Sequence, residues 1–358
     1  MRVVVAMSGG VDSSVAAALL SERGMDVIGV TMFLYDEERE PESGRGCCGS
    51  RAVRDARRVA ARLGIPHYAW DFRKEFEAAV IDDFCAEYAR GRTPNPCMRC
   101  NEKVKFAALL ERSAEPGADA IATGHHARIR RDESGHWCLL KGVDVRKDQS
   151  YFLYGMTQEQ LGRVLMPVGD YSKAEVRECA RRLELTVADK PESQEICFVP
   201  DDDYVRFLRQ RCPEAFRAGP VLDTEGHEIG EHEGIACYTV GQRKGLGLAL
   251  GERRYVVRLD AATNAVVLGT ERDAAVRRVE ATSVNWISGL PPESGVRVWA
   301  KVRYQSRGGP ATVEPLPGRR VSVAFDEPQW APTPGQAIVF WQGDCTLGGG
   351  TIERSLPE

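Results

Sequence analysis

An apolar run followed at once by two glycines, close to the N-terminus, constrains the fold more than any other feature. Residues 3–7 are mostly β-branched and apolar, which is typical of a buried parallel strand, and a Ser-Gly-Gly turn at 8–10 follows directly. Asp12 and Ser13 then suit the first turn of a helix. The sequence therefore predicts a strand, a tight glycine loop and a helix N-terminus, a geometry that favours phosphate or pyrophosphate.

This glycine loop lacks the lysine of a Walker A loop. Residues 8–13 read Ser-Gly-Gly-Val-Asp-Ser, which instead resembles the PP-loop of the ATP pyrophosphatases. Enzymes of that superfamily cleave ATP to AMP and pyrophosphate while they adenylate a substrate oxygen. The resemblance implies a nucleotide site, and the alternative is a turn with a purely structural role.

The first half of the chain alternates between the two kinds of secondary structure. Further strands are expected at 26–35, 67–70 and 118–127, and helices at 50–63, 74–89 and 101–112. Such alternation predicts an α/β fold with a doubly wound parallel sheet, which binds ligands at the carboxyl ends of its strands. Met32 and Gly124 lie on or just after strands that neighbour the loop, so they are candidates to line an adenine and ribose pocket.

The second half has a different texture. A helix after residue 200, a hairpin at 221–229 and short strands at 296–304, 320–325 and 337–341 predict a small α+β unit followed by a β-barrel. We expect three domains, at 1–199, 200–274 and 275–358. The barrel carries no catalytic constellation and is interpreted as a module that holds RNA.

Composition narrows the class of protein. The 358 residues contain eleven cysteines but no run that would span a bilayer and no signal peptide, which predicts a cytoplasmic protein with chemically active thiols and no membrane partner. The net charge of −4 gives no global sign of nucleic-acid binding. Binding would therefore need a local basic face, and arginines and lysines do gather at 90–105 and at 128–147.

Two cysteines stand in contexts that suggest chemistry. Cys100 follows two prolines and is expected just before or within the first turn of a helix, where Arg99 and Lys103 would lower the pKa of its thiol. Cys197 has apolar neighbours, and a buried inert cysteine is about as plausible there as a reactive one.

Taken together, the motifs resemble the bacterial tRNA-specific 2-thiouridylases, which thiolate the wobble uridine of certain tRNAs. The matching stretches occur in family order and cover essentially the whole chain. They are residues 8–14, 95–101, 123–125, 147–153, 196–198, 241–246, 303–304, 333–336 and 347–350.

The resemblance implies the chemistry of the site. ATP, bound with Mg²⁺, would adenylate the C2 oxygen of the uridine. A persulfide on Cys197 would supply the sulfur, and Cys100 would complete the exchange by forming a disulfide or by acting on the persulfide directly. A cysteine desulfurase or sulfur-relay protein would be the persulfide donor. The implied nucleotide residues are Ala6, Met7, Ser8, Gly9, Gly10, Val11, Asp12, Ser13, Met32 and Gly124.

The same resemblance implies a set of tRNA contacts. One group would lie against the target base, a second would grip the anticodon region, and the others would contact the tRNA elsewhere. In that order the residues are Asn95, Pro96 and Cys97; Lys147, Asp148 and Gln149; and His125, Arg303, Tyr304 and Gln336. The uridine would have to leave its stack to reach the adenylating site.

One position departs from the family pattern. Cys97 stands where an aspartate is common, so that Cys97, Cys100 and Cys197 could together hold an iron–sulfur cluster. The alternative, which we favour, is that Cys97 is a tolerated variant packed near the site. Zinc is disfavoured because no fourth ligand is placed by spacing. The vicinal pair Cys47-Cys48 receives no role.

Two other functions use the same loop or the same ligand. PP-loop enzymes include amide-forming ligases that adenylate a carboxylate, but these usually need a glutaminase domain or ammonia channel, and the two thiols would be idle. A non-catalytic tRNA-binding protein with a relic nucleotide fold is disfavoured by the intact loop at residues 8–14.

Overall fold

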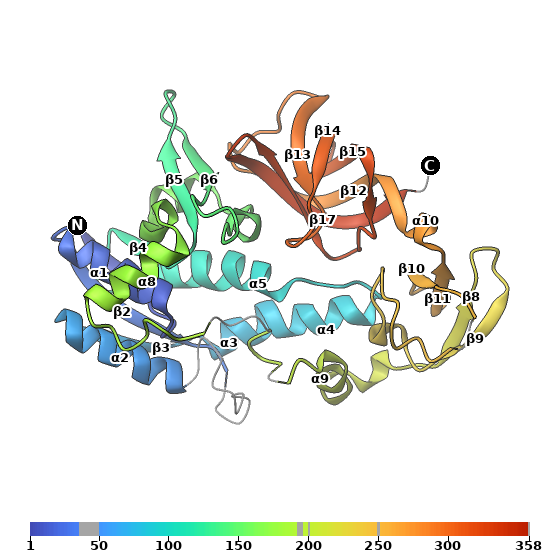
Figure 1. The fold of residues 1–358 in the computed structure, drawn as a ribbon, viewed down its shortest axis with the longest axis horizontal. Helices are drawn as coiled ribbons and strands as arrows, with labels where there is room; N and C mark the ends of the chain where they lie inside the picture. Colours follow the sequence, from blue (N-terminus) through green and yellow to red (C-terminus); the bar gives the residue numbers. More distant parts are fainter. Residues whose placement is uncertain (36–49, 192–195, 200, 249–250, 357–358) are drawn as a thin grey trace.

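The structure is a computed structural model that describes residues 1–35, 50–191, 196–199, 201–248 and 251–356. The described chain forms a five-stranded sheet, a four-stranded sheet and an eight-stranded sheet, which lie side by side in Figure 1. Cys47 and Cys48 lie outside the described residues. None of the described helices is long and apolar enough to cross a membrane.

The five-stranded sheet is parallel throughout and has the order β3-β2-β1-β4-β7. Its strands are β1 (Arg2–Ala6), β2 (Asp26–Phe33), β3 (His67–Asp71), β4 (Ala120–Ala122) and β7 (Val164–Leu165). Val3 and Val5 face one apolar core, whereas Val4 faces a second core on the opposite side of the sheet. Because both faces are covered, a continuous run of valines is what β1 requires. The predicted doubly wound sheet is confirmed.

Helices cover both faces of this sheet. One core contains side chains of α1 (Val11–Glu22), α2 (Ser50–Leu63) and α8 (Lys173–Arg182). The other contains side chains of two long helical segments, one of α3, η2 and α4 (Arg73–Phe76, Glu77–Ile81, Asp82–Ala89) and one of α5, η3 and α6 (Pro96–Arg99, Cys100–Ala108, Leu109–Arg112). Both segments were predicted, but the second begins at Pro96 because proline suits the first turn of a helix.

The predicted strand at 118–127 is shorter than expected. Only Ala120–Ala122 pairs as β4, and the next strand, β5, begins at Ala127. Between them the chain bends toward the glycine loop, where a Cβ added to Gly124 would lie 2.6 Å from the carbonyl carbon of Asp12. Residues 123–126 therefore leave the sheet to contact the start of α1.

The second half has the predicted architecture. Asp203 caps α9 (Tyr204–Arg211), and the hairpin of β8 (Gly219–Leu222) and β9 (Glu228–His232) is antiparallel. With β10 (Tyr255–Asp260) and β11 (Ala265–Gly269) it forms the four-stranded sheet. A barrel follows, closed by pairing of its first and last strands, β12 and β17. Its strands are β12 (Ala275–Trp286), β13 (Val296–Lys301), β14 (Gly309–Leu316), β15 (Arg320–Trp330), β16 (Ala337–Gln342) and β17 (Cys345–Leu356).

A hairpin of the first half joins the barrel to the parallel sheet. It consists of β5 (Ala127–Arg131) and β6 (Trp137–Lys141), and it rises from the first domain beside the barrel in Figure 1. Cys345 and Thr346 of β17 pair with Leu140 and Leu139 of β6. Backbone hydrogen bonds, as well as side chains, thus attach the barrel to the domain that contains the parallel sheet.

Candidate active site

Hydrogen bonds of its own serines hold the glycine loop in shape. The backbone N–H of Ser8 donates to Ser13 Oγ at 3.1 Å, and Ser14 Oγ donates to the Gly10 carbonyl at 2.8 Å. Gly10 occupies the N-cap position of α1 and offers no side chain to cap it. Because the first N–H groups of a helix lack partners within the helix, this end of α1 is suited to bind an anion.

Gly9 is required by its backbone and by its neighbour. Its φ angle is +66°, and an added Cβ would lie 2.7 Å from the carbonyl oxygen of Ala52 in α2. At Gly10 an added Cβ would meet only Ser8 Oγ, at 3.4 Å. The loop therefore fits closely against α2 on one side and stays open where a phosphate would approach.

Asp12, in the first turn of α1, is held between Lys173 and His126. Lys173 Nζ lies 2.6 and 2.7 Å from its two carboxylate oxygens, and His126 Nε2 lies 3.1 Å from Oδ1. Burial opposes the charged carboxylate, but His126 and Lys173 outweigh it and lower the pKa of Asp12. The Asp12 side chain is 29% exposed.

A second lysine reaches the loop from a distant part of the chain. Lys190 Nζ donates to the Gly9 carbonyl at 3.0 Å and pairs with Asp55 at 2.7 Å. Lys173 and Lys190 thus place near this loop the positive charge that a Walker A loop carries within itself. Sequence reasoning missed both lysines. One signal was available, because Ser172 and Glu175 form a capping box that marks Lys173 as the first residue of a helix.

The residues expected to line the nucleoside pocket lie in different environments. Gly124 packs against Asp12, where only a glycine fits. Met32, on β2, is 4% exposed and belongs to the core beneath the sheet. The neighbouring His125 is a predicted tRNA contact, a role that remains a prediction, and its Nδ1 lies 2.8 Å from Thr123 Oγ1. Burial, with the charges of Lys105 and His126, lowers the pKa of His125 well below its ordinary value, so its ring is neutral near pH 7.

The two candidate cysteines border the same apolar core. Cys100 is 8% exposed within this core, and Cys197 is a partly buried residue packed against it. Phe198 anchors the position of Cys197 by ring contacts with its neighbours. Those neighbours are Phe76, Phe84 and Phe207, with ring centroids 5.8, 5.3 and 5.2 Å away. Cys97, by contrast, is exposed, so the expectation that it is packed is wrong.

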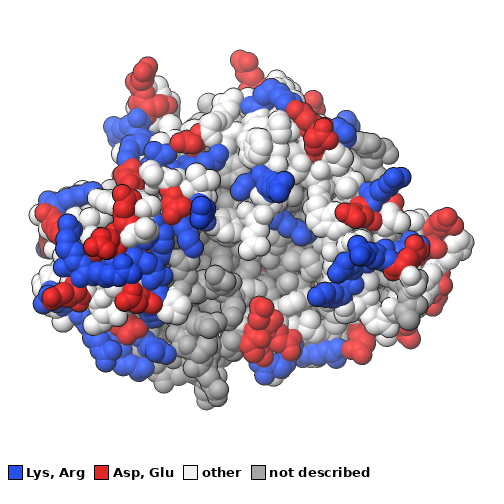
Figure 2. Space-filling model, in the orientation of Figure 1, with Lys and Arg blue, Asp and Glu red and all other residues white. Residues whose placement is uncertain are grey.

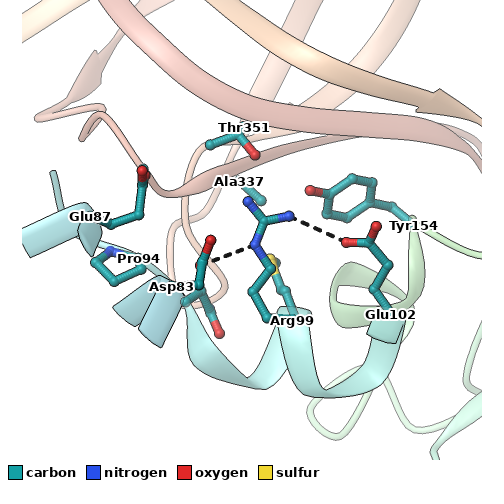
Figure 3. Close-up of a pocket in the computed structure, with 11 residues that line it drawn as sticks. Asp83, Glu87, Pro94, Arg99, Glu102, Tyr154, Ala337 and Thr351 are labelled. Atoms are coloured by element: carbon teal, nitrogen blue, oxygen red, sulfur yellow. Dashed lines mark hydrogen bonds and ion pairs between the residues drawn. The ribbon is translucent and has the colours of Figure 1, made fainter. Parts of the chain in front are cut away.

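Cys100 lies deeper in its helix than predicted, and the cations near it are already paired. Because the helix begins at Pro96, Cys100 comes after the first turn. Arg99 lies 3.2 Å from Asp83 and 3.4 Å from Glu102, as Figure 3 shows. Burial disfavours the Arg99 charge, but these two carboxylates outweigh it and raise the pKa of Arg99.

Figure 3 also shows a small cavity around Arg99, between this helix and the barrel. Its volume is about 20 Å³, which admits roughly one water molecule and no nucleobase. It lies beside Pro94 and Thr351, away from the residues of the glycine loop. The cavity is therefore a feature of the interface between the helix and the barrel.

The segment that leads into this helix is held by hydrogen bonds to the barrel and to the middle unit. Gln336 Nε2 donates to the carbonyls of Thr93 and Pro94 at 2.8 and 3.2 Å, and the Thr93 N–H donates to Pro334 at 2.8 Å. Thr93 Oγ1 also bonds Thr239 Oγ1 of the middle unit at 3.2 Å. Gln336, predicted to contact tRNA, thus holds the approach to Asn95 and Pro96. Its tRNA role remains a prediction.

Arg303 and Tyr304 also make contacts within the protein. The Arg303 guanidinium donates to the carbonyls of Val240 and Ala331 at 2.9 and 2.6 Å, and burial lowers its pKa. The Tyr304 ring lies 4.5 Å from that of Phe152, centroid to centroid. The Arg303 bond to Val240 joins the middle unit to the barrel, and the Tyr304 contact joins the barrel to the first domain. The tRNA roles of both residues remain predictions.

Asp148 and Gln149, expected to grip the anticodon region with Lys147, help to shape their own segment. Asp148 Oδ1 accepts hydrogen bonds from the Gly142 and Ser150 N–H groups, each at 3.0 Å. Gln149 Oε1 accepts from the backbone of His126 at 2.9 Å. Any tRNA contact by these two residues would be made from an already ordered turn.

The basic stretches at 90–105 and 128–147 are largely matched by carboxylates from elsewhere in the chain. Arg92 pairs with Glu87 at 2.7 Å and with Glu353 at 3.0 Å. Arg128 pairs with Asp344, and Arg130 with Asp170. Over the face of the molecule drawn in Figure 2, blue and red side chains are likewise interspersed. A count of local charge therefore overstates the free positive charge.

No three metal-ligating side chains converge at the glycine loop among the residues that the structure describes. Within the described part of the chain, the group of three that does converge is Asp223, Glu225 and His227, which lies in the turn between β8 and β9 and not at the glycine loop.

Fold and site together define the class of protein: an α/β domain with a PP-loop type of anion site and two thiols that border one apolar core, joined to a small sheet and a barrel. Three family models match the chain. They are described as tRNA methyl transferase HUP domain at 1–201, tRNA methyl transferase PRC-barrel domain at 205–270 and Aminomethyltransferase beta-barrel domain at 276–352.

Curated relatives match over the whole length. The tRNA-specific 2-thiouridylase MnmA of Pelotomaculum thermopropionicum is 54% identical over 99% of this chain and 98% of that protein. The proteins of the same name from Heliobacterium modesticaldum and Moorella thermoacetica are 52% and 53% identical, over 99% and 98% of this chain and 93% and 99% of theirs. The chain belongs to the tRNA-specific 2-thiouridylase family.

Solved structures match less closely. A 4-thiouridine synthetase in complex with RNA and bound ATP superposes with a TM-score of 0.35 at 20% identity, over 60% of this chain and 50% of that chain. A superposition this loose supports no conclusion about the site.

The loop geometry predicts that two adjacent glycines differ in their tolerance of alanine. Gly9→Ala should lower the free energy of unfolding by about 1–3 kcal/mol, because it forces a positive φ and a clash with α2. The matched control, Gly10→Ala, should lower it by less than about 1 kcal/mol. Urea unfolding without nucleotide measures both, and equal losses would contradict the close fit of Gly9 against Ala52.

Proposed function

We propose that this protein is a tRNA-uridine 2-sulfurtransferase, which uses ATP to replace the C2 oxygen of the wobble uridine by sulfur. The observation that carries the proposal is identity above 50% to 2-thiouridylases over 98–99% of the chain. The site adds chemical support, because a PP-loop type of anion site and two core-bordering thiols occur together.

The first step would be adenylation. The uridine C2 oxygen attacks the α-phosphorus of ATP, the bond to the β-phosphate breaks, and pyrophosphate leaves. N–H groups at the start of α1, with Lys173 and Lys190 beside the loop, would stabilise the departing charge. Mg²⁺ bound with ATP would offset part of the phosphate charge. The product carries AMP on C2, which is a far better leaving group than an oxide.

The second step would deliver sulfur. Cys197 carries a persulfide, and the Cys100 thiolate attacks the sulfur bonded to Cys197 Cβ, so that a disulfide forms and hydrosulfide departs. Hydrosulfide then adds to C2, and AMP leaves with the electrons of the carbon–oxygen bond. In the other order, the outer sulfur adds to C2 first and AMP leaves. The Cys100 thiolate then attacks the Cys197 sulfur, so that the disulfide forms and 2-thiouridine departs as the thiolate. Both cysteines border one apolar core, and either order requires their sulfurs to meet.

Both orders leave a disulfide between Cys100 and Cys197. A thiol reductant must return its two electrons, and a persulfide donor of the cysteine desulfurase or sulfur-relay class must then reload Cys197. We also propose that the reaction takes place in the cytoplasm. Reducing conditions there suit an enzyme that needs thiols regenerated in each cycle.

Other chemistries fit the site less well. Two matched family models have methyl transfer in their descriptions. Methyl transfer would use neither the PP-loop type of site nor the two thiols. An amide-forming ligase would use the loop but not the thiols. The proposal therefore rests on the only one of these reactions that uses ATP and both cysteines.

The proposed adenylation predicts that AMP and pyrophosphate form only when ATP, Mg²⁺ and tRNA are all present. Asp12→Asn keeps the shape of the side chain but removes the charge that pairs with Lys173, and should slow pyrophosphate release about 100-fold. Asp26→Asn, which alters an exposed pair with Arg2, is the control and should leave the rate unchanged. A wild-type rate in Asp12→Asn would remove Asp12 from the machinery.

The sulfur-transfer step predicts equal losses from two substitutions. Cys100→Ser and Cys197→Ser should each eliminate 2-thiouridine yet keep tRNA binding, because serine cannot carry or exchange sulfur. Cys197→Ser should also fail to accept radiolabelled sulfur from a persulfide donor. Cys179→Ser, on α8, is the matched control. Label on Cys100 instead of Cys197 would reverse the two roles.

The exposed Cys97 separates the persulfide route from an iron–sulfur cluster. We favour the persulfide route, in which Cys97→Ala and Cys97→Asp keep most activity with persulfide as the sulfur source. If Cys97, Cys100 and Cys197 hold a cubane cluster, anaerobic reconstitution should give about four iron atoms per chain, and Cys97→Ala should lose iron. Turnover from persulfide by an anaerobically purified, iron-free protein would exclude the cluster.

A further inference from the structure

The two residues that hold Asp12 are both bonded to a single surface segment. This segment, residues 142–149, connects β6 to the short helix η4 (Ser150–Leu153) and includes the proposed tRNA contacts at 147–149. Two separate sets of hydrogen bonds lead from it to the carboxylate of Asp12.

The first connection passes through Lys173. Asp144 Oδ2 accepts a hydrogen bond from the backbone N–H of Lys173 at 3.0 Å. The Lys173 side chain, 11% exposed, then reaches both carboxylate oxygens of Asp12. The bond from Lys173, with the nearby charges of His126 and Arg146, lowers the pKa of Asp144. Asp144 therefore fixes the first residue of α8, from which the side chain extends to the glycine loop.

The second connection passes through His126, which is 3% exposed. Its backbone N–H donates to Gln149 Oε1 and its carbonyl accepts from the Gln149 N–H, both at 2.9 Å. Its Nε2 lies 3.1 Å from Asp12 Oδ1. A Cβ added to Gly142 would lie 2.6 Å from the His126 carbonyl, so the segment lies directly against this residue. Movement of the segment is therefore passed on to the histidine.

The outer side of the segment faces solvent. Val143 and Val145 are 51% and 81% exposed, and none of residues 142–149 belongs to a helix or strand. A loop with this much exposed surface has lower local stability than the sheet beneath it. A ligand bound on it would restrict the motion that this hydrogen-bonded loop retains, and with it that of Lys173, His126 and Asp12.

We propose that Asp144 is a positioning residue that couples tRNA on the 142–149 segment to the nucleotide loop, an inference that rests on the proposed function. Both ligands bind more tightly when the side chains around Asp12 are ordered. The ligand that binds first therefore bears the free-energy cost of ordering them, and the second ligand does not. By linkage, ATP then tightens tRNA binding by the factor by which tRNA tightens ATP binding. Adenylation consequently proceeds well only when the acceptor is in place.

The test compares tRNA affinity with and without a non-hydrolysable ATP analogue. In the wild type the analogue should tighten tRNA binding about tenfold. Asp144→Ala removes the acceptor for Lys173, so the gain should fall to about twofold or less, while tRNA affinity without nucleotide stays within about twofold of wild type. In pyrophosphate release, Asp144→Ala should lower kcat and leave the KM for tRNA unchanged.

A matched control is available in the same domain. Asp132 also accepts backbone hydrogen bonds with its carboxylate, from Ser134 and His136, but it lies at the tip of the β5–β6 hairpin. Asp132→Ala should keep the wild-type gain. Asp144→Asn, which retains an oxygen able to accept from Lys173, should give a gain above that of Asp144→Ala.

Several outcomes would overturn the inference. The first is a wild type whose tRNA affinity is the same with and without the analogue. The second is an Asp144→Ala variant that keeps the full gain in affinity. The third is an Asp144→Asn variant whose gain is no larger than that of Asp144→Ala. Loss of tRNA affinity alone in Asp144→Ala would make Asp144 a simple tRNA contact. If wild type binds neither tRNA nor the analogue, the proposed function fails too, whereas binding of both with an unchanged gain rejects only the coupling.

Discussion

The ion pairs of Asp12 are the interaction on which the site depends. A partly buried carboxylate loses much of its hydration, and that loss is offset only by well-placed cations and hydrogen bonds. Lys173 comes from α8 and His126 from the chain between β4 and β5, so Asp12 joins three separate parts of the fold at the start of α1. The position of the glycine loop relative to the rest of the domain follows from this meeting.

Short-range patterns predicted the fold well. The valines of β1, the glycine loop and the hairpin of β8 and β9 have signatures that lie within a few residues, and the structure confirms them. Other features depend on residues far apart in the chain. Nothing local to Asp12 indicates Lys173, and nothing near Arg92 indicates Glu353. For this reason sequence reasoning missed Lys173 and overstated the free positive charge.

The thiols illustrate the same limit at shorter range. The sequence singled out Cys100 and Cys197, but the burial of each depends on packing that no periodicity reveals. Phe198 sits among three other aromatic rings, which fixes the chain beside Cys197. The early helix start at Pro96 leaves Cys97 exposed and carries Cys100 into the core. Packing thus gives two cysteines three residues apart different environments.

The pairing of β6 with β17 has a consequence for biosynthesis. More than 200 residues separate Leu140 from Cys345, so the edge of β6 emerges from the ribosome long before its partner strand exists. At about 5–20 residues per second, the wait is roughly 10–40 seconds. During that time the nascent first domain presents an unpaired strand edge, which is a template for association with other chains. When the barrel is complete, β17 pairs with the edge of β6, and this pairing therefore also protects the first domain from aggregation.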